Sequence, residues 1–371
     1  MNNVKKAVLI SCFDWYKKRL EPIRELLLNQ GYEVTILTSD FNHIKKTEIT
    51  ERYLECTYIH VPSYKKNISL KRIKSHLFFG KCVKNKLNQI NPDFIYLLLP
   101  PNNTAKYCTQ YKKERPNTKL IVDIIDLWPE SMPIGFAKKT PLAWIWKKWR
   151  NNAIRIADHV FTECTLYQEK LSYVLNPEKT STLYLFKEQT EKEKLLVQDI
   201  IKNKKDDGVV RFAYLGSMHN IIDIDGICNV LKAYISSGKK CEIHAIGDGE
   251  SRNKFKQMVD NTGCKTFFYG KIFDEIEKIK ILAPCDYAFN MMKDNVSVGL
   301  TIKSIDYLSY GLPLINNIKG DTWNLVQKEK IGTNVGCDTI ELGVFDHEIV
   351  QGVFNTRLTK EIFVKSLSEA I

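Results

Sequence analysis

The sequence predicts an α/β protein of two doubly wound, Rossmann-like domains in tandem, each built on a parallel sheet. Short runs of apolar and β-branched residues alternate with longer helical patterns along the whole chain, and strands separated by helices imply right-handed crossovers and parallel pairing. The 371 residues, 44% of them hydrophobic, are enough for two cores. A highly charged stretch, 187-KEQTEKEKLLVQDIIKNKKDDG-208, separates two series of strands.

Each predicted strand is a short apolar run bounded by polar, glycine or proline residues. The first series is Ala7–Ser11, Glu33–Thr38, Tyr58–Pro62, Asp93–Leu99, Lys119–Ile125, His159–Glu163 and Leu183–Phe186. The second series is Val210–Leu215, Cys241–Ile246, Lys265–Tyr269, Tyr287–Met291, Pro313–Asn316 and Gly332–Val335. The series place domains at 1–188 and 209–355, with a charged helix and linker at 189–208 and a terminal helix at 356–371. We expect the domains to face one another across a cleft at the carboxyl ends of their strands, where open parallel sheets bind ligands.

Composition limits the classes of function. No apolar run approaches the roughly 18 residues of a membrane span, and the first residues lead into a short strand rather than a signal-peptide core. The ten cysteines form no CxxC pair, which indicates reduced thiols in a cytosolic protein, and the seven histidines show no ligand spacing, so no metal site is expected. The net charge of +12 calls for an anionic partner: nucleic acid, an acidic membrane surface or a phosphorylated small molecule.

Two acids in the first half stand directly after predicted strands. Asp126 ends the buried run of 119-KLIVDIIDLWPESMP-133, and Asp14 lies in 11-SCFDWYKK-18 after the first strand. Such positions are the candidates for chemistry in an open parallel sheet. The alternative for Asp126 is that it caps the following turn while Trp128 packs in the core.

In the second half, three stretches end a strand and open a loop or helix: 214-YLGSMHN-220, 243-IHAIGDGESRNKF-255 and 297-SVGLTIKSIDYLSYGLPLIN-316. In the last, Ser297, Gly299 and Thr301 precede a helix at about 302–310, whose free N–H groups and dipole suit a diphosphate. Lys303 in the first turn would add a full positive charge. Asp306, at i+3 from Lys303, could accept hydrogen bonds from a ribose, although the two could also form a surface ion pair.

The order of these motifs resembles a known family. Tyr-Leu-Gly, then Ile-Gly-Asp-Gly-Glu-Ser-Arg, then 268-FYGKI-272, then 301-TIKSIDYLSYGLPLIN-316 is similar to the nucleotide-binding half of GT-B glycosyltransferases. The nearest resemblance is to family 4-like bacterial enzymes of capsule, O-antigen and exopolysaccharide assembly. The segment 126-DLWPES-131 is similar to one in a branch that transfers sugars to lipid-linked acceptors. The resemblance covers essentially the whole chain.

The resemblance implies a hexosyl or deoxyhexosyl transferase that needs no metal or other cofactor and uses a nucleotide-sugar donor, with UDP the expected carrier. The donor contacts that it implies are Gly216, Ser217, Gly247, Lys271, Ile272, Ser297, Gly299, Leu300, Thr301 and Asp306. Retaining members usually carry two glutamates eight positions apart, where this chain has Val298 and Asp306. Basic residues usual after the first strand of this domain are missing, so Lys303 would carry the phosphate charge, and an inverting mechanism stays open.

An inverting transferase needs a base for the acceptor hydroxyl. Asp126 is the first candidate because it combines a strand end with the family motif. Asp14 is the second, and Glu130 is the third, although Glu130 could instead orient the Trp128 loop.

The first half also carries features of a membrane surface. In 138-KKTPLAWIWKKWRNNAIRIADH-159, Trp144 falls beside cations and opposite the predicted core face, and the run Lys65-Lys66 precedes Lys71 and Arg72. We expect a cytoplasmic protein, peripheral on the inner face of the plasma membrane, with a lipid-linked or glycan acceptor. A solvated basic face is the plainer alternative.

Three other functions stay open. A sugar-nucleotide epimerase would keep the GT-B architecture, and so would a catalytically inactive partner subunit. Nucleic-acid binding is not expected, because RNP-like, helix-turn-helix and zinc-finger patterns are missing from the sequence.

Overall fold

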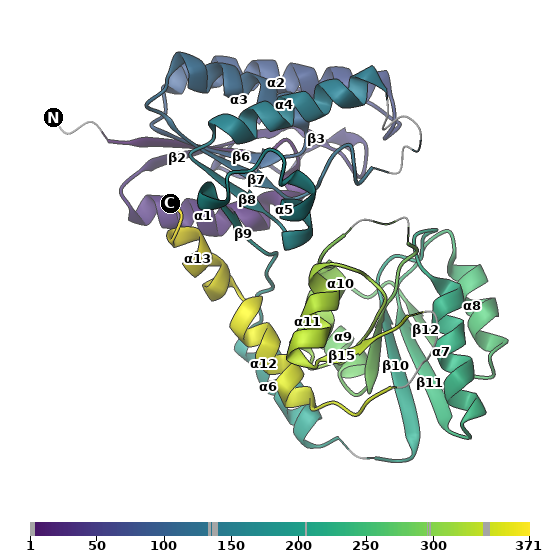
Figure 1. The fold of residues 1–371 in the computed structure, drawn as a ribbon. Helices are drawn as coiled ribbons and strands as arrows, with labels where there is room; N and C mark the ends of the chain where they lie inside the picture. The colour runs from purple at the N-terminus through teal and green to yellow at the C-terminus, as the bar shows by residue number, and fades with distance from the viewer. Residues whose placement is uncertain are drawn as a thin grey trace. The chain divides into compact units, whose positions relative to one another are not determined.

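The computed structural model describes residues 4–132, 135, 140–204, 206–294, 296, 298–336 and 342–371. The chain divides into two compact units: unit 1 is Met1–Tyr184 with Val364–Ile371, and unit 2 is Leu185–Phe363. Each unit contains one large parallel sheet with helices on both faces (Figure 1). The predicted class, two doubly wound Rossmann-like domains, is confirmed.

In unit 1, seven parallel strands take the order β5-β2-β1-β6-β7-β8-β9. The strands are β1 (Lys6–Ile10), β2 (Glu33–Ser39), β5 (Cys56–Ile59), β6 (Phe94–Leu99), β7 (Lys119–Ile124), β8 (His159–Thr162) and β9 (Thr180–Thr182). The short 3₁₀ helix η1 (Asp14–Tyr16) precedes α1 (Lys17–Asn29), and α2 (Leu70–Ile90), α3 (Asn102–Glu114), α4 (Pro141–Ile156) and α5 (Thr165–Leu171) follow. Helices α2, α3 and α4 lie side by side on one face, while α1 and α5 lie on the other (Figure 1).

In unit 2, six parallel strands take the order β12-β11-β10-β13-β14-β15. The strands are β10 (Val209–Leu215), β11 (Lys240–Ile246), β12 (Lys265–Gly270), β13 (Tyr287–Asn290), β14 (Leu314–Asn316) and β15 (Gly332–Asn334). The helices are α6 (Glu191–Lys202), α7 (Ile224–Ser236), α8 (Arg252–Asp260), α9 (Glu275–Leu282), α10 (Ile302–Ser309), α11 (Asp321–Glu329) and α12 (His347–Arg357), and α13 (Lys360–Ser368) leads to the chain end. Strand order reverses beside β1 in unit 1 and beside β10 in unit 2, and such reversals are where doubly wound sheets bind ligands.

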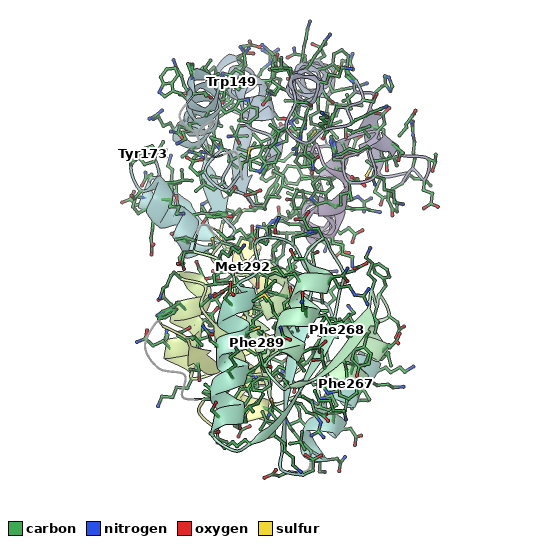
Figure 2. All side chains as sticks on the ribbon, turned by 90° about the vertical axis from the view of Figure 1, so that its right-hand side faces the viewer. Trp149, Tyr173, Phe267, Phe268, Phe289 and Met292 are labelled. Carbon is green, nitrogen blue, oxygen red and sulfur yellow. The ribbon has the colours of Figure 1, made fainter. Side chains whose placement is uncertain are left out.

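Central strands are apolar on both faces because helices cover both sides of a parallel sheet. All six residues of β6, Phe94–Leu99, are buried. In unit 2, Phe289 points into the interior, and its ring stacks on Phe212 with centroids 5.2 Å apart (Figure 2). Continuous apolar runs therefore identified these strands correctly in the sequence.

Two predicted strands need correction, and one hairpin was not predicted. The predicted strand Leu183–Phe186 is wrong, since β9 ends at Thr182, just before it. The predicted strand Tyr58–Pro62 is displaced, since β5 covers Cys56–Ile59. A small antiparallel hairpin of β3 (Phe41–Asn42) and β4 (Thr47–Glu48) was not predicted, because two-residue strands leave no periodic pattern.

A buried ion pair explains both the acid inside β7 and the run after β9. Arg19 of α1 donates from Nε to Asp123 Oδ2 (2.7 Å) and from Nη2 to Asp123 Oδ1 (2.9 Å), and both side chains are almost fully buried. The Tyr96 hydroxyl also donates to Asp123, at 2.7 Å. Arg19 donates further to the carbonyls of Leu183 and Tyr184, so these residues satisfy a buried guanidinium instead of extending the sheet.

We expect Asp123→Leu to lower the free energy of unfolding by about 3–5 kcal/mol, because it leaves the Arg19 charge buried without a counter-charge. The measurement is urea unfolding followed by circular dichroism. The double variant Arg19→Met/Asp123→Leu should recover part of this loss. As a control, Glu114→Ala breaks the partly exposed Lys84–Glu114 pair and should cost under about 1 kcal/mol. An Asp123→Leu loss as small as that control would contradict the role of the pair.

Candidate functional site

In unit 2, Gly216 and Gly247 follow the adjacent strands β10 and β11, and Gly270 is the last residue of the next strand, β12. The Gly216 N–H donates to the Ile246 carbonyl (3.0 Å), and the Gly247 N–H donates to the Gly270 carbonyl (2.7 Å). Gly247 has φ 147, and a Cβ there would lie 1.9 Å from the Gly216 carbonyl oxygen. The close approach leaves no room for a side chain at position 247. The backbones of two predicted donor residues, Gly216 and Gly247, are therefore in direct contact.

The loop before α10 is held by hydrogen bonds at the end that leads into the helix. The Gly299 carbonyl accepts from the N–H (2.9 Å) and the hydroxyl (2.7 Å) of Thr322 in α11. Thr301 caps α10: its hydroxyl accepts from the Ser304 N–H at 3.1 Å, and Ser304 in turn accepts from the Thr301 N–H. Leu300 is buried, and the predicted Ser297 lies outside the described residues. The first N–H groups of α10, which no helical carbonyl can reach, are thereby fixed in place.

Lys303 lies beside the end of β10. Its Nζ is 5.6 Å from the ring centroid of Tyr214, whose hydroxyl donates to the Ser217 carbonyl at 3.1 Å. The Leu215 N–H donates to the Tyr307 hydroxyl of α10 at 2.6 Å. The structure thus brings together the turn at Gly216 and Ser217 and the first turn of α10. Burial lowers the pKa of Lys303 to about 8.

Asp306 is paired, but with a partner that sequence spacing does not indicate. Its Oδ1 is 2.7 Å from Lys187 Nζ, which also lies 2.5 Å from Glu275 Oε1, and the Tyr310 hydroxyl donates to the same Glu275 oxygen. Burial raises the pKa of Glu275, but Lys187 more than reverses this, leaving it at about 2. The Lys303–Asp306 ion pair considered above is therefore replaced by a Lys187–Asp306 pair. Lys187 holds the predicted ribose-binding carboxylate in position.

Two further predicted residues, Lys271 and Ile272, follow Gly270 at the end of β12. The Lys271 side chain is exposed and lies 3.7 Å from Asp248 Oδ2. The contact of the Lys271 and Ile272 backbone with a nucleotide base stays a prediction.

An amide ladder crosses β13, β14 and β15 and was missed from the sequence. Asn290 Nδ2 donates to Asn316 Oδ1 (2.9 Å), and Asn316 Nδ2 donates to Asn334 Oδ1 (2.8 Å). The Thr301 hydroxyl donates to Asn290 Oδ1 at 2.9 Å, which ties the α10 cap to the sheet. The three asparagines meet only because the strands pair in this register.

In unit 1, Asp126 closes the turn after β7. Its Oδ2 accepts from Trp128 Nε1 at 2.7 Å, and its Oδ1 accepts from the Ser131 hydroxyl. Burial raises the pKa of Asp126, although these two hydrogen bonds oppose the shift. The capping alternative is therefore present in the structure, together with a carboxylate whose pKa has moved toward the working range of a base.

Glu130 is held by Arg150, a fully buried side chain of α4. The two form a bidentate pair at 2.8 and 3.0 Å, and Arg150 also donates to the Trp128 carbonyl at 3.0 Å. Burial raises the pKa of Glu130, but the Arg150 hydrogen bonds outweigh it and the pKa is lowered. This geometry favours the role of orienting the Trp128 loop.

Asp14, the remaining catalytic candidate, begins η1 after β1. Its Oδ2 accepts from Asn42 Nδ2 at 3.1 Å, while its Oδ1 is buried without a hydrogen-bond partner. Burial raises the pKa of Asp14. An orphaned carboxylate oxygen at the end of a central strand is a feature that a ligand would complete.

Beside Trp128 lies a small cavity of about 110 Å³, with apolar walls that include Met132 and Trp146. The Arg72 guanidinium lies 4.7 Å from the centre of the Trp128 ring. His76 is buried in the same wall, and its Nε2 has no hydrogen-bond partner. In the sequence, Arg72 was identified only as part of a basic run, and no pattern marked His76 as a candidate site residue.

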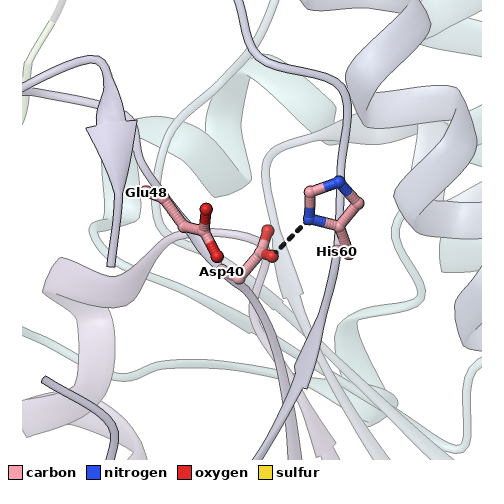
Figure 3. Close-up of side chains that lie close together, drawn as sticks. All are labelled: Asp40, Glu48 and His60. Carbon is pink, nitrogen blue, oxygen red and sulfur yellow. Dashed lines mark hydrogen bonds and ion pairs between the residues drawn. The ribbon is translucent and has the colours of Figure 1, made fainter. Parts of the chain in front are cut away.

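Asp40, Glu48 and His60 bring three possible metal-ligand atoms within 4.8 Å of one another (Figure 3). His60 Nδ1 is 2.7 Å from Asp40 Oδ2, and the Val61 N–H donates to Asp40 Oδ1. These residues come from three separate segments, so no ligand spacing marks them in the sequence. The donor set of two carboxylates and an imidazole suits a divalent cation, but His60 and Glu48 are largely exposed. The expectation of metal-independent chemistry stays a prediction.

Solved structures similar to this chain share one architecture. Sucrose-phosphate synthase from Thermosynechococcus elongatus aligns at TM-score 0.67 and 13% identity over 98% of both chains. The lipopolysaccharide outer core galactosyltransferase WaaB aligns at 0.63 and 13% over 99% of this chain and 98% of its own. Starch synthase IV from Arabidopsis thaliana, bound to ADP and acarbose, aligns at 0.52 and 9% over 100% of this chain and 95% of its catalytic domain. The chain has the GT-B fold.

No family model and no curated protein matches the sequence. The GT-B assignment therefore rests on structure, and it gives the fold that the motif order implied. In this GT-B chain the predicted donor residues belong to unit 2, and the predicted acids Asp14, Asp126 and Glu130 belong to unit 1. Among the described residues, every helix is too short or too polar to cross a bilayer.

We expect Lys303→Ala to weaken UDP binding about 10- to 100-fold, because a charge-assisted hydrogen bond is worth about 1.5–3 kcal/mol. Titration calorimetry with UDP measures this. Wild-type affinity should fall as pH rises through about 8, where the Lys303 ammonium loses its proton. Lys303→Arg should keep its affinity above that pH.

The matched control for Lys303 is Lys328→Ala, which removes an exposed lysine from the last turn of α11. Equal losses in Lys303→Ala and Lys328→Ala would contradict a specific role for Lys303.

Proposed function

We propose that this chain transfers a sugar from a nucleoside diphosphate, with UDP the expected carrier, to a lipid-linked or growing glycan in bacterial surface polysaccharide synthesis. The observation that carries the proposal is the position of Lys303. A half-buried ammonium in the first turn of α10, beside Tyr214 at the end of β10, joins the first N–H groups of the helix in a combination suited to a diphosphate. The GT-B fold, and the sugar-transferring proteins that share it, support this assignment.

Sugar transfer needs the charge on the leaving diphosphate to be stabilised and the proton of the acceptor hydroxyl to be removed. As the bond from the sugar carbon to the diphosphate breaks, negative charge grows on the leaving oxygen. Lys303 and the α10 N–H groups would stabilise this charge without reorganising. As the acceptor oxygen bonds to the same carbon, Asp126 would take its proton.

Asp126→Asn should keep the affinity for UDP but lower turnover by about 10²- to 10⁴-fold, because the amide cannot accept the proton. Transfer from UDP-sugars to a polyprenyl diphosphate-linked saccharide, followed by mass spectrometry, measures turnover. In the wild type, the rate should fall as pH drops through the raised pKa of Asp126, since the protonated carboxyl is no longer a base.

Alternative functions give different results in the same assay. Conversion of a UDP-sugar without acceptor would identify an epimerase. An absence of nucleotide binding would favour an inactive partner subunit.

A lipid-linked acceptor is supported by one surface of unit 1, at the starts of α2 and α4. Apolar side chains are exposed there: Ile68 by 65%, Leu70 by 81%, Leu142 by 39% and Trp144 by 61%. Lys65, Lys66, Lys71 and Lys74 are exposed around α2, and the 110 Å³ cavity lies between the two helix starts. Apolar groups ringed by lysines match an anionic lipid interface.

Charge reversal of these lysines to glutamate should abolish co-sedimentation with phosphatidylglycerol vesicles, because each lysine contributes about 1 kcal/mol at such a surface. Arg72 is left unchanged, since it stacks on Trp128. The control reverses two exposed lysines of α8, Lys254 and Lys256, and should bind as the wild type does. Retention of vesicle binding after the fourfold reversal would rule out this surface.

A further inference from the structure

A second and larger cavity lies within unit 1, where β1 and β2 end. Its volume is about 610 Å³, inside the range of roughly 300–1,000 Å³ usual for small-molecule sites. The segment Ser11–Lys18 forms one wall, Thr38 and Tyr58 lie on the strand side, and the β3–β4 hairpin with the loop after it forms the other wall. The cavity is therefore part of the ligand-binding edge of a doubly wound sheet.

Two polar atoms in this cavity wall are buried without partners. Thr38 is 6% exposed, and its hydroxyl makes no hydrogen bond. Asp14 Oδ1 is likewise unpaired, although Asn42 occupies the other carboxylate oxygen. Buried polar atoms are usually satisfied, so both indicate a ligand with groups that donate and accept. Alcohol hydroxyls do both.

An aromatic platform stands next to Asp14. Trp15 remains 38% exposed, and one side of its ring stacks on Phe13 with centroids 4.5 Å apart and planes inclined by 6°. The His43 ring packs edge-on against Trp15 at 5.9 Å. These contacts fix the orientation of the indole while leaving part of it in the cavity. The electron-rich face of a fixed indole attracts the C–H groups on the face of a pyranose ring.

The charge of the cavity is nearly balanced. Its acids are Asp14, Glu21, Glu48 and Glu51, and its bases are Lys17, Lys18 and Lys45. Lys17 is already committed to Glu55 (2.9 Å) and Glu21 (3.6 Å). An anionic ligand would find no surplus of positive charge here, in contrast to the surface at the start of α2. The lining favours a neutral, hydroxyl-rich ligand.

We propose that this cavity binds neutral pyranose units of the acceptor glycan, with Trp15 stacking on a ring and Asp14 and Thr38 binding its hydroxyls. The proposal rests on the proposed function, since it names which part of the acceptor unit 1 holds. It also assigns Asp14 to sugar binding and leaves proton removal to Asp126.

The test uses the full chain and saturation-transfer NMR with four neutral disaccharides: chitobiose, lactose, maltose and mannobiose. At least one should receive saturation from the protein, and Trp15→Ala should weaken its binding at least tenfold. Thr38→Val, which keeps the side-chain shape, should weaken it several-fold and guards against misfolding of the Trp15 variant. The control is Tyr269→Ala in unit 2, which removes an aromatic of matching exposure, 39%, and should change nothing.

Three results would overturn the proposal. They are no NMR saturation transfer from the protein to any of the four disaccharides, unchanged disaccharide binding in Trp15→Ala and Thr38→Val, or a preference for glucose 6-phosphate over the neutral sugars. UDP binding, measured in parallel, separates this outcome from failure of the proposed function. Disaccharide binding without UDP binding would keep the cavity and reject the transferase. UDP binding and sugar transfer with no effect of Trp15→Ala would keep the transferase and reject the cavity.

Discussion

Parallel strand pairing is the constraint on which the chemistry of this chain depends. All strands of each large sheet are parallel, so their carboxyl ends lie at the same end of the sheet. The loops that follow the strands there lie outside the hydrogen-bonded sheet. Both sheets reverse their strand order beside their first strand. Asp14 follows the first strand in unit 1, and Gly216 follows it in unit 2. The candidate residues of both units are therefore products of the same topology.

Lys303 stands at a position where a lysine does not stabilise its own helix. A lysine in the first turn of a helix opposes the helix dipole, and partial burial adds a desolvation cost that lowers its pKa. The capping box of Thr301 and Ser304 already stabilises this helix end, so the lysine is not needed for the helix to begin there. A bound diphosphate would offset both unfavourable terms at once. The same anion would use the helix N–H groups that the cap leaves unpaired.

The sequence was sufficient for features encoded in local patterns and insufficient for those created by tertiary contacts. The apolar run Phe94–Leu99 and the capped helix from Thr301 to Gly311 each carry their signal within a few residues. Lys187 and Asp306 meet across 119 positions, and the asparagine ladder depends on strand register, so neither leaves a local pattern. The apolar run Leu183–Phe186 was wrongly predicted as a strand because hydrophobic periodicity cannot show that Arg19 donates hydrogen bonds to the Leu183 and Tyr184 carbonyls.

The distribution of charge in unit 1 connects the two proposed binding features. A net charge of +12 could belong to any protein with an anionic partner, but in unit 1 four exposed lysines surround the start of α2, beside exposed apolar side chains. The cavity beyond β1 and β2 is nearly neutral and carries a fixed indole instead. A lipid-linked glycan has the same division, with an apolar anchor and a phosphate at one end and neutral sugars at the other. Each part of unit 1 would therefore recognise the part of the acceptor whose chemistry matches it.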